Sequence, residues 1–132
     1  MNDYNSQYSG ARIEELLAMI PNLAKADLSN AMTVNLNRNG YAKFNNGLLI
    51  QWGYSSSSGR NKTIYLPTSF YDTNYSVLVT MKRTVDDTTN YTGDVWTQNK
   101  SSFLMFGLYH STDTNNGAFW GGFNWFAIGR WK

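Results

Sequence analysis

The pattern of apolar and polar positions divides this chain into a helical start and a long β-type remainder. Near the N-terminus the apolar residues recur at helical spacing, in the order Ile13, Leu16, Leu17, Ile20. This stripe predicts an amphipathic helix over residues 11–20. Ser9 is placed to cap its start and Pro21 to end it. Because so short a helix is marginal in water, its stripe must be buried against another surface.

Two surfaces are open to this stripe. With Leu23 added, the spacing also fits two heptads, with Ile13 and Ile20 at one core position and Leu16 and Leu23 at the other. The pattern alone leaves open whether the helix packs on its own domain or on other copies of the chain. Residues 22–39 predict a connector with a short extended piece, so we expect residues 1–39 to be helix plus connector.

From Gly40 onward the pattern indicates strands throughout, which makes residues 40–132 one β domain. The expected strands are residues 41–44, 46–53, 62–66, 75–83, 95–98, 101–109 and 123–131. Turn signals separate them, among them Asn45-Asn46-Gly47, which predicts a hairpin between the first two strands. Residues 84–94 and 110–122 are expected to be long polar loops. The chain is therefore predicted to be an antiparallel β-sandwich of about six or seven strands preceded by a short helix.

The strands at residues 46–53 and 123–131 are the most apolar and aromatic. We expect them to be the central strands of one sheet. Their apolar residues, including Leu49, Trp52, Trp125 and Ile128, are interpreted as core and subunit contact. Gln51 and Asn124 are expected to satisfy backbone groups at a strand edge or subunit seam, as buried amides commonly do.

Three segments resemble a family of bacteriophage tail-fibre C-terminal domains. GYAKFNNGLLIQWG, residues 40–53, is similar to the opening hairpin of these domains, and FNWFAIG, residues 123–129, to the strand with which they end. Between them IYLPTSF, residues 64–70, resembles a strand leading into a Pro-x-x-Phe turn. The three segments occur in the family's order and span roughly the last two-thirds of the chain.

The resemblance implies a trimeric fibre tip of the virion that recognises a bacterial surface glycan: lipopolysaccharide, capsule or wall polysaccharide. It favours the heptad interpretation, because residues 1–39 would then end a fibre shaft. Synthesis in the host cytoplasm, without a signal peptide, is expected. The alternative is a structural module that trimerises and terminates the fibre without touching the receptor. No motif in residues 84–122 matches the family, so contact residues do not follow from it.

Composition and charge exclude several other classes. The 132 residues include no cysteine, so disulfides, thiolate metal sites and cysteine nucleophiles are ruled out. A net charge of +2 with scattered basic residues argues against nucleic-acid binding. No apolar run is long enough for membrane insertion. We expect neither cofactor nor metal, since the aspartates match no EF-hand spacing and a single histidine is a poor transition-metal site.

Catalysis is also not expected. His110 is the only histidine, and neither Ser102 nor Ser111 lies in a nucleophile-elbow pattern with it. A glycosidase needs two placed carboxylates, one with a raised pKa. Glu14 and Glu15 both lie on the predicted helix, and the aspartates lie in polar loops where nothing would raise a pKa. We therefore predict a binding protein and not an enzyme.

A saccharide site needs an exposed aromatic ring beside amides and carboxylates, and the two predicted loops carry these groups. Loops on a rigid β scaffold commonly hold recognition residues. The candidate contacts are Asp87, Asn90, Tyr91, His110, Asp113, Asn115, Asn116, Phe119 and Trp120. Inward packing at the start of the last strand is the competing interpretation for Phe119 and Trp120. Tyr54, Arg60 and Lys62 form a weaker third group.

Overall fold

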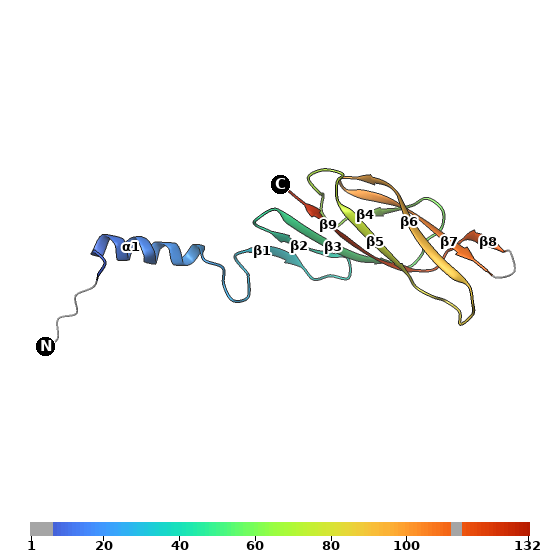
Figure 1. The fold of residues 1–132 in the computed structure, drawn as a ribbon, viewed down its shortest axis with the longest axis horizontal. Coiled ribbons are helices and arrows are strands. Elements are labelled where there is room, and N and C mark those ends of the chain that lie inside the picture. Colours follow the sequence, from blue (N-terminus) through green and yellow to red (C-terminus); the bar gives the residue numbers. More distant parts are fainter. Residues whose placement is uncertain (1–6, 112–114) are drawn as a thin grey trace. The chain divides into compact units, whose positions relative to one another are not determined.

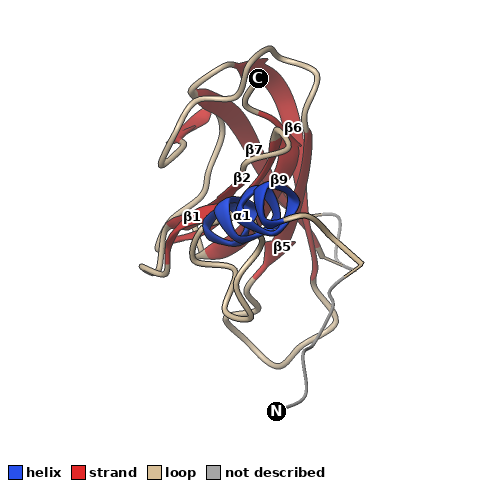
Figure 2. Ribbon diagram, turned by 90° about the vertical axis from the view of Figure 1, so that its left-hand side faces the viewer, coloured by secondary structure: helices blue, strands red, loops and turns tan. Residues whose placement is uncertain are grey.

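The computed structural model describes residues 7–111 and 115–132 and divides the chain into two units, Met1–Met32 and Thr33–Lys132. The first unit contains α1 (Gly10–Met19), followed by a 3-10 turn of Ile20–Asn22 (Figure 2, blue). The Oγ of Ser9 accepts a hydrogen bond from the backbone N–H of Arg12 at 3.2 Å, which confirms the predicted cap. In the described part of this unit no residue of α1 is buried, so its apolar stripe has no partner within the unit.

The second unit is built of strands joined by turns and loops (Figures 1 and 2). The strands among the described residues are β1 (Met32–Asn35), β2 (Gly40–Phe44), β3 (Leu48–Ser55), β4 (Lys62–Tyr65), β5 (Ser76–Met81), β6 (Asn90–Asn99), β7 (Ser102–His110), β8 (Asn116–Ala118) and β9 (Phe123–Arg130). Five of them form sheet A, in the order β1-β2-β3-β9-β5. Sheet B has the order β4-β7-β6, with β8 pairing β7. The predicted antiparallel β architecture is confirmed.

β3 and β9 lie side by side inside sheet A and pair antiparallel along their full lengths, from Leu48 opposite Arg130 to Ser55 opposite Phe123. This confirms the prediction that the two most aromatic segments are central neighbours. The hairpin between β2 and β3 is also confirmed, with Lys43 opposite Leu49 and a tight turn at Gly47. The φ of Gly47 is +106°, a conformation that glycine adopts readily.

The core lies between the two sheets. On the facing sides, Leu49 and Trp125 of sheet A are buried together with Phe103 and Met105 of sheet B. The Phe103 and Trp125 rings meet edge to face, with their centroids 5.7 Å apart. Of the residues predicted to be core or subunit contact, Leu49 and Trp125 are buried, whereas Trp52 and Ile128 lie on the outer face of sheet A.

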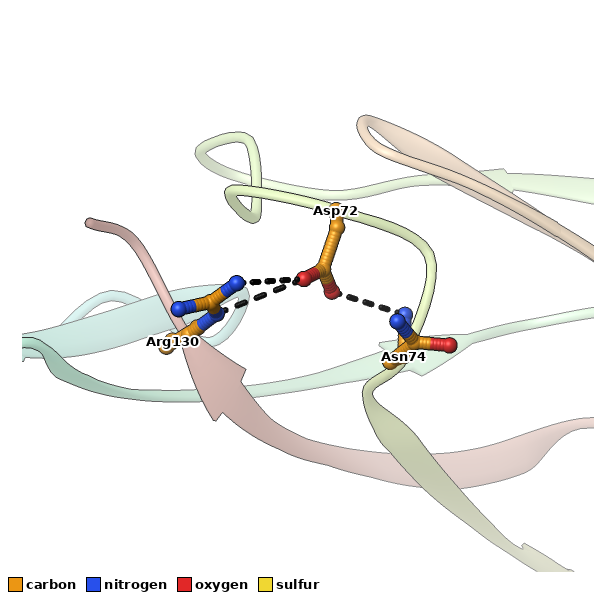
Figure 3. Close-up of polar contacts among 3 residues, drawn as sticks. All are labelled: Asp72, Asn74 and Arg130. Atoms are coloured by element: carbon orange, nitrogen blue, oxygen red, sulfur yellow. Dashed lines mark hydrogen bonds and ion pairs between the residues drawn. The ribbon is translucent and has the colours of Figure 1, made fainter.

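An exposed ion pair fixes the chain where it enters β5. The guanidinium of Arg130, at the end of β9, donates from Nε and Nη2 to Asp72 Oδ2 at 3.3 and 3.0 Å (Figure 3). The other oxygen, Oδ1, accepts from the backbone N–H of Asn74 at 2.9 Å. Asp72 thereby links a turn that follows β4 to the last strand of the chain.

The structure departs from the predicted strands in three places. β1 forms the edge of sheet A within the segment interpreted as a connector. β6 begins at Asn90, so half of the predicted loop at residues 84–94 is strand. β8 lies inside the predicted loop at residues 110–122. The reason is the same at β6 and β8, because β7 offers free backbone groups along both of its edges and polar residues pair there despite weak strand propensity.

Candidate functional site

Three of the predicted contact residues form one row across the end of sheet B. Asn90 of β6 stands opposite His110 of β7, which stands opposite Asn116 of β8. All three are exposed. A hydrogen bond of 3.1 Å joins His110 Nδ1 to Asn116 Oδ1. The amide oxygen accepts in this bond, so Nδ1 of the imidazole is the donor. We call Asn90, His110 and Asn116 the polar row.

Two further predicted residues form a ring pair. The rings of Tyr91 and Phe119 contact each other with centroids 4.4 Å apart, tilted by 48°. Phe119 is only 6% exposed, so its ring supports Tyr91 from inside the domain and offers a ligand little surface. The inward-packing interpretation therefore describes the position of Phe119. Tyr91 is half-buried and carries the accessible part of the pair.

Arg83 connects Asp87 to this ring pair. Its guanidinium lies 5.5 Å from the centroid of the Tyr91 ring, and its Nη1 donates to the backbone O of Asp87 at 2.7 Å. The Asp87 carboxylate lies 3.6 Å from Nη1 and accepts from the backbone N–H of Thr89 at 2.9 Å. No role for Arg83 was predicted from the sequence, because nothing in the spacing of residues 83–91 shows that the chain folds back on itself.

The polar row and the ring pair lie on opposite faces of sheet B. Neighbouring residues of a strand alternate between faces, and paired residues across a ladder share one. Asn90 and Tyr91 are such neighbours, as are His110 and Tyr109, which stands opposite Tyr91. The structure therefore brings the two predicted loops to one end of the sheet (Figure 1, where β6, β7 and β8 meet) but divides their side chains between the outer and inner faces.

Trp120 lies apart from both groups. Its ring is 69% exposed and lies over Gly59, where an added Cβ would come within 2.5 Å of the indole. Gly59 also has a φ of +116°, so both its backbone and its packing favour glycine. The hydroxyl of Ser58 donates to the backbone O of Phe119, which ties this loop to the chain preceding Trp120.

The remaining candidates are placed as follows. Asn115 is exposed, and its backbone O accepts from Ser111 at 3.0 Å. Asp113 lies outside the described residues. The weaker third group is not brought together, because its members contact different partners: the Tyr54 ring lies under Arg38, Arg60 lies over Phe106, and Lys62 donates to Ser57.

The described side chains also bear on metal binding and acid catalysis. In the described part of the chain, no three His, Asp or Glu side chains are grouped closely enough to hold a metal ion. The pKa values of Asp27 and Asp72 both lie below the usual range, chiefly because the backbone N–H groups of Ser29 and Asn74 donate to them. A general acid needs the opposite shift.

None of the described helices is both long enough and apolar enough to cross a membrane.

The sequence of residues 43–130 matches the family described as "Putative tail fiber protein gp53-like, C-terminal". The match covers more than half of the chain, and the chain belongs to this family of tail-fibre domains. The resemblance inferred from residues 40–53, 64–70 and 123–129 is thereby confirmed at the level of the family. Among curated proteins, none matches the sequence.

Solved structures of similar fold are also tail fibres. An N-truncated R1-type pyocin tail fibre aligns with a TM-score of 0.61 and 18% identity, over 95% of this chain and 99% of that chain. An N-truncated R2-type pyocin tail fibre aligns with a TM-score of 0.59 and 15% identity, over 98% of this chain and 54% of that chain. The C-terminal residues 323–691 of a P. aeruginosa R2 pyocin fibre align with a TM-score of 0.59 and 16% identity, over 98% of this chain and 37% of that chain.

The chain thus spans about half the length of the R2-type fibre fragment that it matches. At these identities the likeness shows a shared fold. The tail-fibre role of the chain rests on the family match.

Proposed function

We propose that this tail-fibre domain is the receptor-binding tip of the fibre, acting as a homotrimer of the virion that binds a saccharide on the bacterial surface. One observation carries the proposal: two segments far apart in sequence converge at one end of sheet B and present the polar row there. The exposed amides of Asn90 and Asn116 and the imidazole of His110 offer donors and acceptors side by side. Sugar hydroxyls need such paired partners.

The ligand class follows from this chemistry. The row consists of two amides and an imidazole and contains no carboxylate, which suits a polyol better than a metal ion. Tyr91, supported by Phe119, lies on the inner face at the same end of the sheet and is not a member of the polar row. Lipopolysaccharide, capsule and wall polysaccharide all present polyols. Tail-fibre domains of this fold are generally not enzymes, and we propose no catalysis.

The second candidate function is structural. The outer face of sheet A carries a row of apolar residues, Trp52, Phe126 and Leu78, opposite one another on β3, β9 and β5. Leu78 is 67% exposed and Phe126 36%, and such a patch marks an interaction surface. In this alternative the domain holds the fibre together, and the receptor is bound elsewhere.

Binding of the full chain to a panel of bacterial cells, and to arrayed lipopolysaccharides, capsules and wall polysaccharides, tests the proposal. The double variant His110→Ala/Asn116→Ala should bind at least about tenfold more weakly than wild type, because it removes two neighbouring hydrogen-bonding groups. Thr73→Ala is the matched control, since Thr73 lies beside Gln98 at the opposite end of β6 and is exposed.

Each result decides between the candidates. Equal binding by wild type and the double variant would show that the polar row is not the site. A wild type that binds no cell and no glycan would favour the structural function. Release of reducing ends from a bound polysaccharide would reveal an enzyme, and we expect none.

A further inference from the structure

Trp96 is an exposed tryptophan of β6, two residues beyond the predicted loop at residues 84–94. Its side chain is 69% exposed, although tryptophan is usually buried over most of its surface. The register of β6 against β7 shifts at this point, with Val95 opposite Met105 and Thr97 opposite Leu104. Trp96 is therefore the extra residue of a β-bulge. Bulges re-aim side chains and are frequent beside functional sites.

A second ring orients this indole. Phe106 of β7 meets Trp96 edge to face, with the ring centroids 6.1 Å apart and the planes at 72°. The guanidinium of Arg60 lies 5.8 Å from the centroid of the same Phe106 ring. Trp96 thus projects from a strand, on a ring that is itself held in place. We call Trp96 and Phe106 the aromatic platform.

The aromatic platform lies on the same face of sheet B as the polar row. Met105 is fully buried on the inner face, so Phe106 points outward, and Leu108 and His110 follow it on that face at every second position. Phe106 and His110 are four positions apart in β7, which corresponds to roughly 13 Å along the strand. Between them lie Leu108 and, opposite it, Thr92 and Ala118.

The surroundings of the platform distinguish it from the apolar face of sheet A. Asp94 stands opposite Phe106 and is exposed, and Thr97 follows Trp96 directly. Arg60 adds a cation. A ring among a carboxylate, a hydroxyl and a guanidinium suits a ligand that has both an apolar face and hydroxyl groups. The row of Trp52, Phe126 and Leu78 has no charged group among its members and suits another protein surface.

We infer that the aromatic platform is a second saccharide subsite and that the ligand is an oligosaccharide which extends along the outer face of sheet B from the polar row to Trp96. The inference rests on the proposed function, because it takes its ligand class from it. A single hexose ring is shorter than the separation of the two groups, so only a longer chain reaches both. A pyranose ring would pack its C–H face on the indole, and its hydroxyls would donate to Asp94.

The alternation of β6 contained part of this signal. Simple alternation places Trp96 on the same face as Asp94, opposite to the face of Val95. Two features appear only in the structure. One is the bulge, which interrupts the alternation at Trp96, and the other is the contact between the rings of Trp96 and Phe106.

The test measures affinity against ligand length. Full-length wild type, Trp96→Ala and Trp96→Phe are titrated with size-fractionated oligosaccharides. These are released separately from the lipopolysaccharide, capsule and wall polysaccharide of a bacterium that the wild type binds. We expect Trp96→Ala to lose about tenfold in affinity for the longer fragments, with Trp96→Phe between it and wild type. Affinity for mono- and disaccharides should not change. Tyr71→Ala, which removes an exposed ring beside Arg130, is the matched control.

The outcomes separate the two proposals. If Trp96→Ala binds long and short fragments as wild type does, while His110→Ala/Asn116→Ala loses both, the platform is not a subsite and the proposed function stands. If Trp96→Ala changes the sedimentation coefficient and not the affinity, the platform is a subunit contact and the inference is wrong. If wild type binds no fragment of any length, both proposals are wrong.

Discussion

The side chain of Gln51 forms two hydrogen bonds with the backbone of a single residue, Thr68. Its Nε2 donates to the carbonyl of Thr68 at 2.9 Å, and its Oε1 accepts from the N–H of Thr68 at 3.0 Å. Gln51 is fully buried. The side-chain amide therefore takes the place of a neighbouring strand. It satisfies the backbone C=O and N–H of Thr68, which follows β4 and is not part of a strand.

Replacing Gln51 by alanine should lower the free energy of unfolding by about 2–4 kcal/mol, because it leaves both Thr68 groups without their partner and opens a cavity. Urea unfolding followed by fluorescence measures this change. Gln7→Ala, at an exposed position, is the control and should stay within about 0.5 kcal/mol of wild type. A Gln51 variant as stable as wild type would show that water replaces the amide.

Gly53 lies directly opposite Trp125, and the indole covers it. An added Cβ would lie 2.4 Å from the Trp125 ring, so Gly53→Ala should destabilise the domain by about 1–3 kcal/mol through overpacking. Thermal unfolding measures the loss. Gly10→Ala is the matched control, because nothing outside its chain neighbours and its own helix backbone lies within 4 Å of its Cβ position, and alanine favours helix. Equal destabilisation of both variants would contradict the packing argument.

These two sites show where sequence patterns succeed and fail. The Asn-Gly turn between the strand signals at residues 41–44 and 46–53 predicted the β2–β3 hairpin, because these signals are local. The pairing of β3 with β9 was predicted from shared aromatic character, and the structure confirms it. The partner of Gln51 was not predictable, since Thr68 lies 17 residues away and nothing local specifies their contact.

The candidate site was less predictable than the fold for the same reason. Composition singled out Asn90, His110 and Asn116, but only the pairing of β6, β7 and β8 puts them in a row. The segment Asn116–Ala118 has no apolar alternation and becomes a strand because the edge of β7 is free to pair. No role for Trp96 was predicted, because a bulge depends on the pairing of two strands and cannot be seen in one of them.

Asp72 provides a test by pH. Its pKa lies below the usual 3.8, first because the backbone N–H of Asn74 donates to it and then because Arg130 does. A carboxyl group whose pKa is lowered on folding stabilises the fold above the unfolded pKa, and this contribution is lost as the pH falls through the lowered value. NMR titration of the Asp72 carboxyl carbon should therefore give a midpoint below 3.8.

Arg130→Gln tests the order of these causes. Since the Asn74 N–H remains, the midpoint of Asp72 should rise but stay below 3.8. Asp72→Asn should remove the part of the stability loss at acid pH that comes from protonation of this carboxyl group. A wild-type midpoint at or above 3.8 would contradict the hydrogen-bonded geometry in Figure 3.

Tyr75 gives the complementary effect at alkaline pH. Burial raises the pKa of its hydroxyl to about 12, while Gln98 acts in the opposite direction. The hydroxyl lies 2.8 Å from the carbonyl of Asn99 and 2.9 Å from that of Ser102, to which it donates. A pKa raised on folding gives stability that is complete below the unfolded value near 10 and is lost as the pH rises toward 12.

Spectrophotometric titration should accordingly show one of the nine tyrosines ionising about two pH units above the usual value near 10. Tyr75→Phe should abolish this late phase and flatten the loss of stability between pH 10 and 12, at a cost of about 1 kcal/mol at neutral pH. Tyr65→Phe, at an exposed position, is the control. A late phase that survives Tyr75→Phe would assign it to another tyrosine.

Self-association tests the homotrimer directly. Phe126 stands between Trp52 and Leu78 in the outward row of sheet A, and a glutamate there would place a charge in the middle of an apolar contact. We expect wild type to sediment as a trimer and Phe126→Glu to dissociate at micromolar concentrations, because an uncompensated buried charge is strongly unfavourable. Thr73→Glu, outside this face, should remain trimeric.

The helix stripe supplies the second half of this test. Leu16 of α1 and Ile20 of the 3-10 turn that follows it belong to the apolar stripe, and both are exposed among the described residues of their unit. If α1 and sheet A both contact other copies, Leu16→Asn/Ile20→Asn should weaken the trimer independently of Phe126→Glu, and the combined variant should be monomeric. Additive loss across the two units would support association through both, since sites that act independently contribute additively. A trimer that survives the combined variant would place the subunit contact on another face of the domain.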